Sequence, residues 1–516
     1  MRIYARLVIV LSAFFFASCE GWLDLKPETQ ATEDQVFSTV DGYRSVLNGL
    51  YKSMASASLY GRELTFGMLD CMSQQYDLRE ETMKDQKYLD AGKFDYRSNY
   101  LNSSINEIWA KGFNVIANAN NLIQNLEKCS SDFFGKGDVE KNMMLGEAYA
   151  CRAMMHFDLV RLFAPAPVSK DNGAYVPYVE TYPDIMADGI GVSEFMDKVI
   201  RDLEHARDLT IGLDTSAIGQ CFMESPKSRF QNTLNTSMPA YNKAKDYDSF
   251  FMGRGYRLSY YAITALLARA YLYTERYDDA LTAAQSVIDA TAVQYNPTQM
   301  FSDGSWMNMM YGLDLEKSTD LKLLTNLVFA LYNEKAYDEF GLSRFFSKEA
   351  GLDNYYFVMK KSLFTNPAGT DESQQDSRYS HLRYMAKQQY ALSGKYYCSN
   401  DVNTRKQNVT IVPMIRSSEM QYIVAECSAR KNDFAQVQNV LGMMKYWRGL
   451  YASVSVDNWG DFEKELISDA RREWIGEGQL FFLYKRLNAD VDFDGNVKRP
   501  LTKAESVLPI PDDQSL

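Results

Sequence analysis

Residues 258–290, LSYYAITALLARAYLYTERYDDALTAAQSVIDA, contain the pattern that decides the fold. Small and large side chains recur there at the spacing that places them on one face of a helix. Small residues at such positions allow two antiparallel helices to approach closely, while larger residues pack around them. The positions that fit this arrangement are Ala268, Tyr271, Tyr277, Ala280, Ala284 and Val287. The stretch therefore predicts a pair of packed helices.

The same arrangement recurs more loosely at residues 416–444, where matching offsets are held by Ala425, Ser428, Phe434, Val437 and Leu441. Both stretches have the pattern of tetratricopeptide helix pairs. One such pair cannot bury its apolar face alone, so several pairs must stack into a superhelix with a concave side. We therefore expect an all-α dominated fold, a tetratricopeptide-like helix-pair superhelix with long irregular loops and a few short strands.

Three further amphipathic helices are expected nearer the N-terminus. The first covers residues 32–51 and opens with a Thr/Gln capping box. The second carries an apolar stripe over residues 105–126. The third begins near Leu145 and stops at Pro165, because a proline ring removes a backbone donor and clashes with the preceding turn.

Long stretches without a helical pattern separate these helices. Residues 60–100, 211–255, 291–323 and 346–412 are rich in Asn, Asp, Ser, Gly and Tyr, and show no sustained helical period. Loops of this length inside a compact domain are more often functional than empty. They are expected to include short strands, such as Val409–Val412.

Composition narrows the classes of protein to consider. With 46% hydrophobic and 24% charged residues, the chain has ample material for a folded core. The net charge of −12 argues against a nucleic-acid partner, because binding to phosphates needs a basic surface.

Residues 1–18 are expected to be a lipoprotein signal peptide. Arg2 and Arg6 give a positive start, and the apolar run at residues 7–16 is too short to span a bilayer. Small residues then precede Cys19, as in a bacterial lipobox, so Cys19 is predicted to carry the lipid anchor. The alternative is an ordinary signal peptide followed by a chance cysteine. The other six cysteines match no disulfide framework, and we expect most of them to be free.

Several segments together resemble one family, the SusD/RagB outer-membrane lipoproteins of Bacteroidetes-type bacteria. The opening pattern of that family is similar to Cys19, Leu23-Asp24, Pro27 and Asn48-Gly49-Leu50-Tyr51. Its tryptophan helix resembles Trp109 to Asn120, and its next helix resembles GEAYACRAMMHFDLVRLFAPAP at 146–167. The C-terminal resemblances are residues 415–450, RREWIGEGQLFFLYKRLN at 471–488, and Leu508–Pro511.

The resemblance implies a single SusD-like domain over residues 19–516, with an N-terminal part at 19–323 and a C-terminal part at 324–516. It implies a lipid-anchored protein on the outer membrane, facing the cell exterior. Such a protein captures a glycan, or an oligopeptide in some members, and delivers it to a SusC-like TonB-dependent transporter barrel. The resemblance implies neither catalysis nor a cofactor.

Glu473 and Glu477 raise the alternative of a surface-anchored glycoside hydrolase. Paired carboxylates can act as acid and base on a glycosidic bond, but such a pair usually comes from separate chain positions across a cleft. We favour ion pairs with the basic residues close in sequence, which are Arg471, Arg472, Lys485 and Arg486. With only three histidines, His156, His205 and His381, the chain is also poor in the usual general base.

A weak calcium candidate lies near the C-terminus. Asp490, Asp492 and Asp494 alternate and are followed by Gly495, as at the start of an EF-hand-like loop. The twelfth position is Leu501, so the bidentate carboxylate that completes such a site is missing. An acidic surface turn is the favoured interpretation.

Ligand binding is expected in the tyrosine-rich loops, because sugar faces stack on aromatic rings while neighbouring polar groups bind the hydroxyls. Trp306 and Tyr311 are the best pair, since DGSWMNMMYG gives the tryptophan little reason to belong to the core. Tyr76, Tyr88 and Tyr96 are weaker candidates. The favoured alternative for each residue is that it anchors its loop in the core.

Overall fold

The structure is a computed structural model and describes residues 33–183, 188–291, 299–303, 314–346, 355–387, 389–493 and 497–512. The chain divides into two units, Met1–Ser45 and Val46–Leu516, and each is described by itself. Helix α2 (Glu33–Val36) lies in the first unit, and α3 (Val40–Met54) runs from the first into the second.

The single helix expected over residues 32–51 is interrupted between α2 and α3. The hydroxyl of Thr39 accepts a hydrogen bond from the backbone N–H of Gly42, and Ser38 donates to the carbonyl of Gln35. Such hydroxyl side chains compete with helical hydrogen bonds and favour the ends of helices. The local pattern therefore gives two helices instead of one.

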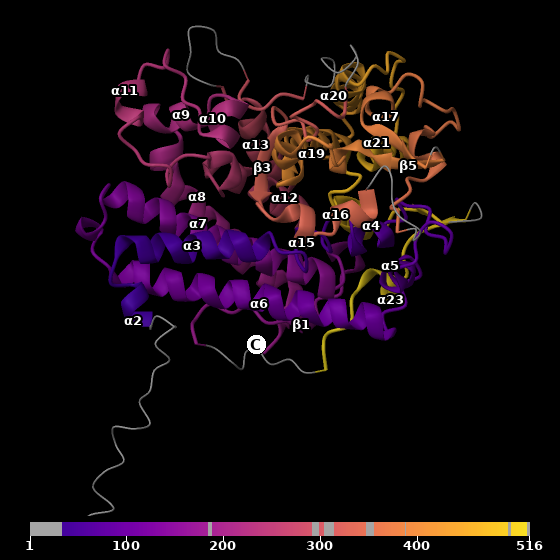
Figure 1. Cartoon of the computed structure of the whole chain (residues 1–516). Helices are drawn as coiled ribbons and strands as arrows, with labels where there is room; N and C mark the ends of the chain where they lie inside the picture. Colours follow the sequence, from indigo (N-terminus) through magenta and orange to yellow (C-terminus); the bar gives the residue numbers. More distant parts are fainter. Residues whose placement is uncertain are drawn as a thin grey trace, which may run out of the picture. The chain divides into compact units, whose positions relative to one another are not determined.

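Three long helices of the second unit pack in succession. They are α6 (Asn99–Lys128), α7 (Asp138–Phe163) and α8 (Val192–Asp214), with α6 against α7 and α7 against α8. Figure 1 shows α6 and α7 side by side. Ser98 caps α6 by accepting a hydrogen bond from Leu101, and α7 ends just before Pro165, as predicted. Both expected helices are confirmed.

The predicted helix pairs are also confirmed. The first pair is α12 (Tyr260–Tyr273) and α13 (Tyr277–Ile288), and the second is α19 (Ser417–Arg430) and α20 (Phe434–Trp447). Helix α8 packs on α12, α12 on α13, α13 on α19 and α19 on α20. These contacts extend the row that begins with α6, which is how stacked pairs cover the apolar face that one pair leaves open.

Short helices occupy much of the stretches expected to be loops, which corrects that part of the prediction. They are α4 (Met68–Met72), α5 (Gln86–Gly92), α9 (Ala217–Met223), α10 (Pro226–Gln231), α11 (Tyr241–Ala244), η3 (Arg254–Tyr256), η5 (Lys361–Phe364), α17 (Ser377–His381), η6 (Gly394–Tyr396) and α18 (Val402–Val409). Other short helices lie outside or at the edge of those stretches: η1 (Ser131–Phe133), η2 (Pro167–Ser169), α15 (Ala336–Glu339) and α16 (Leu342–Phe346). Helices of one or two turns are too short to show a period in the sequence, so a pattern search assigns them to loops.

The described strands form four two-stranded antiparallel sheets. They are β1 (Ala174–Val176) with β2 (Ile190–Gly191), β3 (Leu327–Tyr332) with β6 (Ile411–Arg416), β4 (Arg383–Ala386) with β5 (Tyr390–Ser393), and β7 (Val491–Asp492) with β8 (Lys498–Arg499). In the longest ladder, Leu327 faces Arg416 and Tyr332 faces Ile411. The strand expected at Val409–Val412 exists, but it begins at Ile411 because α18 continues to Val409.

The C-terminal segment returns to the centre of the second unit. Helix α21 (Trp459–Glu473) is followed by a turn, then by α22 (Gln479–Leu487), and α23 (Lys503–Ser506) comes near the end. Gly478 in the turn has φ +71°, and a Cβ at that position would lie 2.1 Å from the carbonyl oxygen of Leu64. Asp70 of α4 fixes the turn by accepting backbone hydrogen bonds from Gly476 and Gly478.

Candidate functional site

A groove runs along helices α13, α19 and α20, and we call it the amide groove. It consists of two adjoining hollows of about 520 and 930 Å³ that share Gln285, Val424 and Gln436 in their walls. Its lining combines amides and hydroxyls with apolar and a few charged side chains: Leu281, Thr282, Gln285, Ser286, Ile288, Asp289, Gln299, Phe301, Ser302, Asp303, Ser417, Gln421, Val424, Ser428, Lys431, Asp433, Gln436, Asn439, Val440, Met443, Met444 and Trp447.

Helix α20 supplies one wall of the amide groove. Gln436, Asn439, Met443 and Trp447 follow at spacings of three and four, so they share one face. The adjacent positions Val437, Val440, Leu441 and Met444 are buried and hold the helix on the core, and Val440 and Met444 also line the first hollow. The ring of Trp447 lies 5.7 Å from that of Tyr446, which in turn lies 5.5 Å from Tyr451. Tyr446 and Tyr451 are exposed, so aromatic surface continues beyond the end of the helix.

The amide side chains of the groove are available to a ligand. Within the described residues, the side chains of Gln421, Gln436 and Asn439 make no hydrogen bond. Each amide carries both donors and an acceptor, which matches a hydroxyl that also does both. The groove can therefore bind a polyhydroxylated molecule by hydrogen bonds while Trp447 offers an apolar ring.

One of the three aspartates that line the amide groove, Asp303, is neutralised from beneath; the other two are Asp289 and Asp433. Asp303 accepts a hydrogen bond from Asn326 at 2.6 Å and forms an ion pair with Arg448, whose Nη1 lies 2.9 Å from Asp303 Oδ2. Arg448 also donates to the carbonyl of Met444 on α20. These contacts fix Asp303 relative to α20. Arg448 also neutralises most of the negative charge that Asp303 would otherwise present to the groove.

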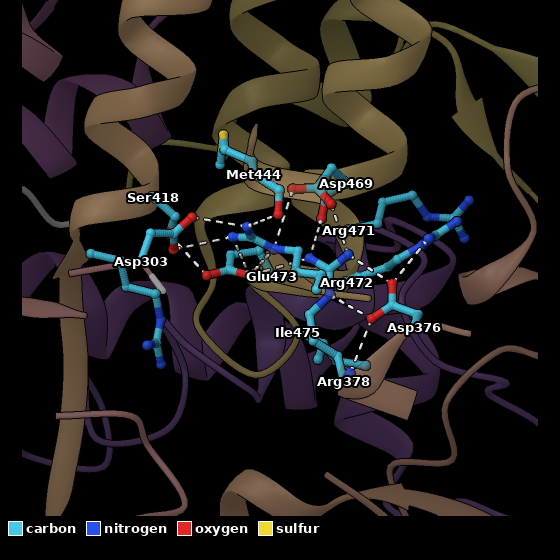
Figure 2. Close-up of polar contacts among 12 residues, drawn as sticks. Asp303, Asp376, Arg378, Ser418, Met444, Asp469, Arg471, Arg472, Glu473 and Ile475 are labelled. Carbon is cyan, nitrogen blue, oxygen red and sulfur yellow. Dashed lines mark hydrogen bonds and ion pairs between the residues drawn. The ribbon is translucent and has the colours of Figure 1, made fainter. Parts of the chain in front are cut away.

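Behind Asp303 lies a continuous series of buried charges, which we call the buried ion chain. Asp303 pairs with Arg448, and Arg448 pairs with Glu473. Glu473 and Asp469 both pair with Arg378, and the series continues through Asp376 and Arg472 to Glu372. Figure 2 shows Glu473 and Asp469 among these arginines, with Ser418 donating to Glu473. Isolated buried charges are costly, whereas charges paired and hydrogen-bonded on every side are tolerated.

The structure separates Glu473 from Glu477 and corrects their expected partners. Glu473 ends α21, and Glu477 lies in the turn after it, so the two carboxylates do not share a helical turn. Glu473 pairs with Arg378 at 3.2 Å and Arg448 at 3.1 Å. The basic sequence neighbours predicted as partners bond elsewhere: Arg471 to Asp492, Arg472 to Glu372, Lys485 to the carbonyl of Arg161, and Arg486 to Glu426.

Glu477 has its own pair of cations. Arg416 donates to both of its carboxylate oxygens, at 2.7 and 2.6 Å, and Lys395 Nζ lies 2.7 Å from Oε1. Burial alone would raise the pKa of Glu477, but Arg416 and Lys395 lower it below its usual value. Burial likewise opposes ionisation of Glu473, and Arg448 and Arg378 reverse this and bring its pKa to about 2.

The directions of these two pKa shifts indicate whether Glu473 or Glu477 could act as a catalytic acid. A glycosidase acid needs a raised pKa, so that its proton is still present near neutral pH. Glu473 and Glu477 have lowered pKa values, and their exposed fractions are 0% and 4%. Their arrangement suits structural ion pairs and offers no proton donor to a substrate.

The predicted aromatic binding residues fall into two groups. Trp306 and Tyr311 lie outside the described residues. Tyr76, Tyr88 and Tyr96 are buried, and their hydroxyls donate to Asp70, Glu63 and the carbonyl of Glu505. These contacts agree with the alternative in which loop tyrosines anchor their loops, and a binding role for any of the five stays a prediction.

The remaining candidates are partly described. Cys19 and Asp494 lie outside the described residues. Asp492 accepts a hydrogen bond from Ser362 and pairs with Arg471, and no cluster of three or more metal-ligating side chains occurs among the described residues. His156 is buried and stacked on Tyr178 with ring centroids 3.9 Å apart, and burial holds its pKa well below the usual value.

Comparisons with known proteins agree with this architecture. A SusD-like family profile described as "Starch-binding associating with outer membrane" matches residues 21–212. A curated relative, SusD-like protein P2 of Formosa agariphila, is 23% identical over 193 residues. That alignment covers 36% of this chain and 34% of the relative, so the chain matches about a third of the relative's length.

Solved structures extend the likeness in fold to almost the whole chain. A SusD superfamily protein of Bacteroides thetaiotaomicron has a TM-score of 0.65 at 20% identity and covers 92% of this chain and 97% of its own. Surface glycan-binding protein A of the same species has a TM-score of 0.62 at 13% identity, with coverage of 92% and 96%. The fold is thus the helical fold of the SusD superfamily. The chain is therefore similar to SusD-like proteins in sequence over residues 21–212 and in fold over almost its whole length.

Sequence reasoning missed the amide groove. Its positions on α20 are readable as a second stripe beside the buried one, formed by Gln436, Asn439, Met443 and Trp447. That signal is weak, because an exposed polar face is the usual state of a surface helix. Only the packing of α13 and α19 beside α20 turns the stripe into the wall of a groove.

Proposed function

We propose that this chain is a carbohydrate-binding protein of the cell surface, held on the outer membrane by a lipid on Cys19. The amide groove is the observation that carries the proposal. Amides that make no hydrogen bond to any described residue lie beside Trp447, and this combination can bind sugar hydroxyls and an apolar sugar face. The family description and the name of the glycan-binding structural relative support the same ligand class.

In this proposal the protein captures a glycan, or an oligopeptide, and passes it to a SusC-like TonB-dependent transporter barrel. The similarity of residues 21–212 to the SusD-like profile supports this setting, since that profile is described as associating with the outer membrane. Among the described residues, none of the helices is long and apolar enough to cross a bilayer. The protein performs no catalysis of its own, and the lowered pKa values of Glu473 and Glu477 support that part of the proposal.

The test is equilibrium binding of the full-length chain, purified in detergent, to soluble starch, dextran, xylan and a mixture of oligopeptides. Trp447→Ala is expected to weaken the best glycan roughly thirtyfold, because removing a central aromatic anchor costs about 2 kcal/mol. The control is Tyr100→Ala, which removes a ring that is 63% exposed on α6. Equal affinity of the Trp447→Ala variant and the unaltered chain for every glycan would contradict this site.

A further inference from the structure

A second groove lies on other elements of the same unit, and we call it the tyrosine groove. Two hollows of about 700 and 230 Å³ share Phe230, Gln231, Tyr256 and Tyr332 in their walls. These residues come from α10, η3 and the end of β3. None of them lines the amide groove, so the two grooves are separate sites.

Aromatic rings form the centre of the tyrosine groove. The ring of Tyr256 lies 5.0 Å from that of Phe230 and 5.3 Å from that of Tyr332. Tyr332 is 46% exposed at the end of β3, whereas Phe230 is 7% exposed and supports the rings from the core. An exposed ring held in place by others is a rigid platform for an apolar sugar face.

Hydrogen-bonding groups surround this platform. The side-chain amides of Gln231, Asn232 and Gln407 line the groove and make no hydrogen bond within the described residues. A ring flanked by amides with both donors and acceptors suits a saccharide better than an apolar peptide or a lipid chain.

The charged side chains that line the tyrosine groove favour acidic saccharides over neutral ones. Its lining includes the cations Lys52, Arg257, Lys335 and Lys406 and the anions Glu334 and Glu339, an excess of cations in a chain whose net charge is −12. Glu334 pairs with Lys406, and Glu339 accepts a hydrogen bond from Asn333. Lys52 and Lys335 form no ion pair within the described residues, so they can bind an anionic group of a ligand.

Arg257 is held rigidly at the side of the groove. Its guanidinium lies 5.0 Å from the ring centres of both Tyr51 and Phe250 and donates to Asn48 at 2.8 Å. Its charge is offset by Glu147, at 3.5 Å, so Lys52 and Lys335 remain the cations with free charge.

We propose that the tyrosine groove is a second saccharide site that binds acidic glycans, with a sugar ring on Tyr332 and its carboxylate or sulfate on Lys52 and Lys335. This site goes beyond the proposed function, which concerns the amide groove. Uronate and sulfate share the anionic chemistry, and the experiment separates them.

The test compares matched acidic and neutral polymers at low ionic strength, using the full-length chain in detergent. Polygalacturonate is paired with its methyl ester, and dextran sulfate with dextran. At least one acidic polymer is expected to bind about fivefold or more tighter than its neutral partner, and added salt should reduce that preference. Absence of a preference for either acidic polymer would overturn the proposal.

Variants then locate the binding. Tyr332→Ala is expected to weaken binding of the acidic polymer about fivefold. The double variant Lys52→Gln/Lys335→Gln is expected to abolish the preference for the acidic polymer over its neutral partner. Tyr100→Ala is expected to change neither the affinity nor the preference. If the Tyr332 and lysine variants bind like the unaltered chain, the acidic polymer binds elsewhere and the proposal fails. Trp447→Ala is expected to weaken only neutral glycans, so failure of the amide groove and failure of the tyrosine groove give different results.

Discussion

Glu477→Gln tests whether the paired carboxylates are structural. The substitution keeps the shape of the side chain and removes a charge that Arg416 and Lys395 both contact, at 2.6 to 2.7 Å. The carboxylate is 4% exposed and both cations are 2% exposed, so water does not replace the lost charge. Breaking a buried ion pair of this kind costs about 3–5 kcal/mol, and we expect the free energy of unfolding to fall by that amount near pH 7.

The assay is urea denaturation of the full-length chain in detergent, followed by the fluorescence of its tryptophans, together with glycan affinity of the folded variant. Asp279→Asn is the control, because its pair with Arg276 joins side chains that are 51% and 42% exposed and that line neither groove. Exposed pairs contribute about 0–1 kcal/mol, so the control is expected to unfold almost like the unaltered chain.

Stability and glycan affinity are expected to respond differently to this change. Glycan affinity of folded Glu477→Gln should match the unaltered chain, because Glu477 lines neither groove. A loss of less than about 1 kcal/mol in unfolding free energy would refute the structural assignment. Glycan hydrolysis that disappears in a stable Glu477→Gln variant would restore the glycoside hydrolase alternative.

Two other predictions concern acid stability and the membrane. Because the folded pKa of Glu473 is about 2, below its ordinary 4.5, its contribution to stability is present above pH 4.5 and is lost as the pH falls towards 2. The loss is roughly 3 kcal/mol and is measured by denaturation at a series of pH values; a flat profile from pH 5 to 2 would contradict it. Cys19→Ala is expected to move the chain from the membrane fraction to the soluble fraction, whereas the unaltered chain should co-purify with a TonB-dependent barrel in mild detergent. Membrane retention of the variant would contradict the lipid anchor.

The helix pairs were predictable because their signal is local. In α12 and α13, alanines such as Ala268, Ala280 and Ala284 recur within a few turns, and all three are fully buried. Close approach of two helices leaves room only for small side chains, so the packing produces a short-range period in the sequence. Helix α7 was predictable from an equally local signal, because Pro165 marks its end.

The ion partners were not predictable, because they come from distant parts of the chain. Arg378 is 95 residues from Glu473, and Arg416 is 61 residues from Glu477. The basic residues near the two glutamates in sequence are the obvious candidates, yet the end of α21 and the turn at Gly476 direct the carboxylates elsewhere. Ion pairs form between residues that the tertiary fold brings together, and no periodic pattern in a single sequence predicts those contacts.

The grooves were missed for a related reason. Tyr332 and Trp447 each lie at the end of an element, and neither is flanked by a motif. Tyr332 gains its role from Tyr256 and Phe230, which are far from it in sequence and which reach it through the packing of β3 on η3.

The pairing of Asp303 with Arg448 has a consequence for protein engineering. Residues 304–313, which include Trp306 and Tyr311, follow Asp303 directly in the sequence, and the buried ion chain holds Asp303 at 2.9 Å from Arg448. A graft that replaces residues 304–313 and leaves Asp303 in place keeps both partners of this ion pair. Asp303 is therefore a natural N-terminal boundary for exchanging that segment with segments from relatives that bind other ligands.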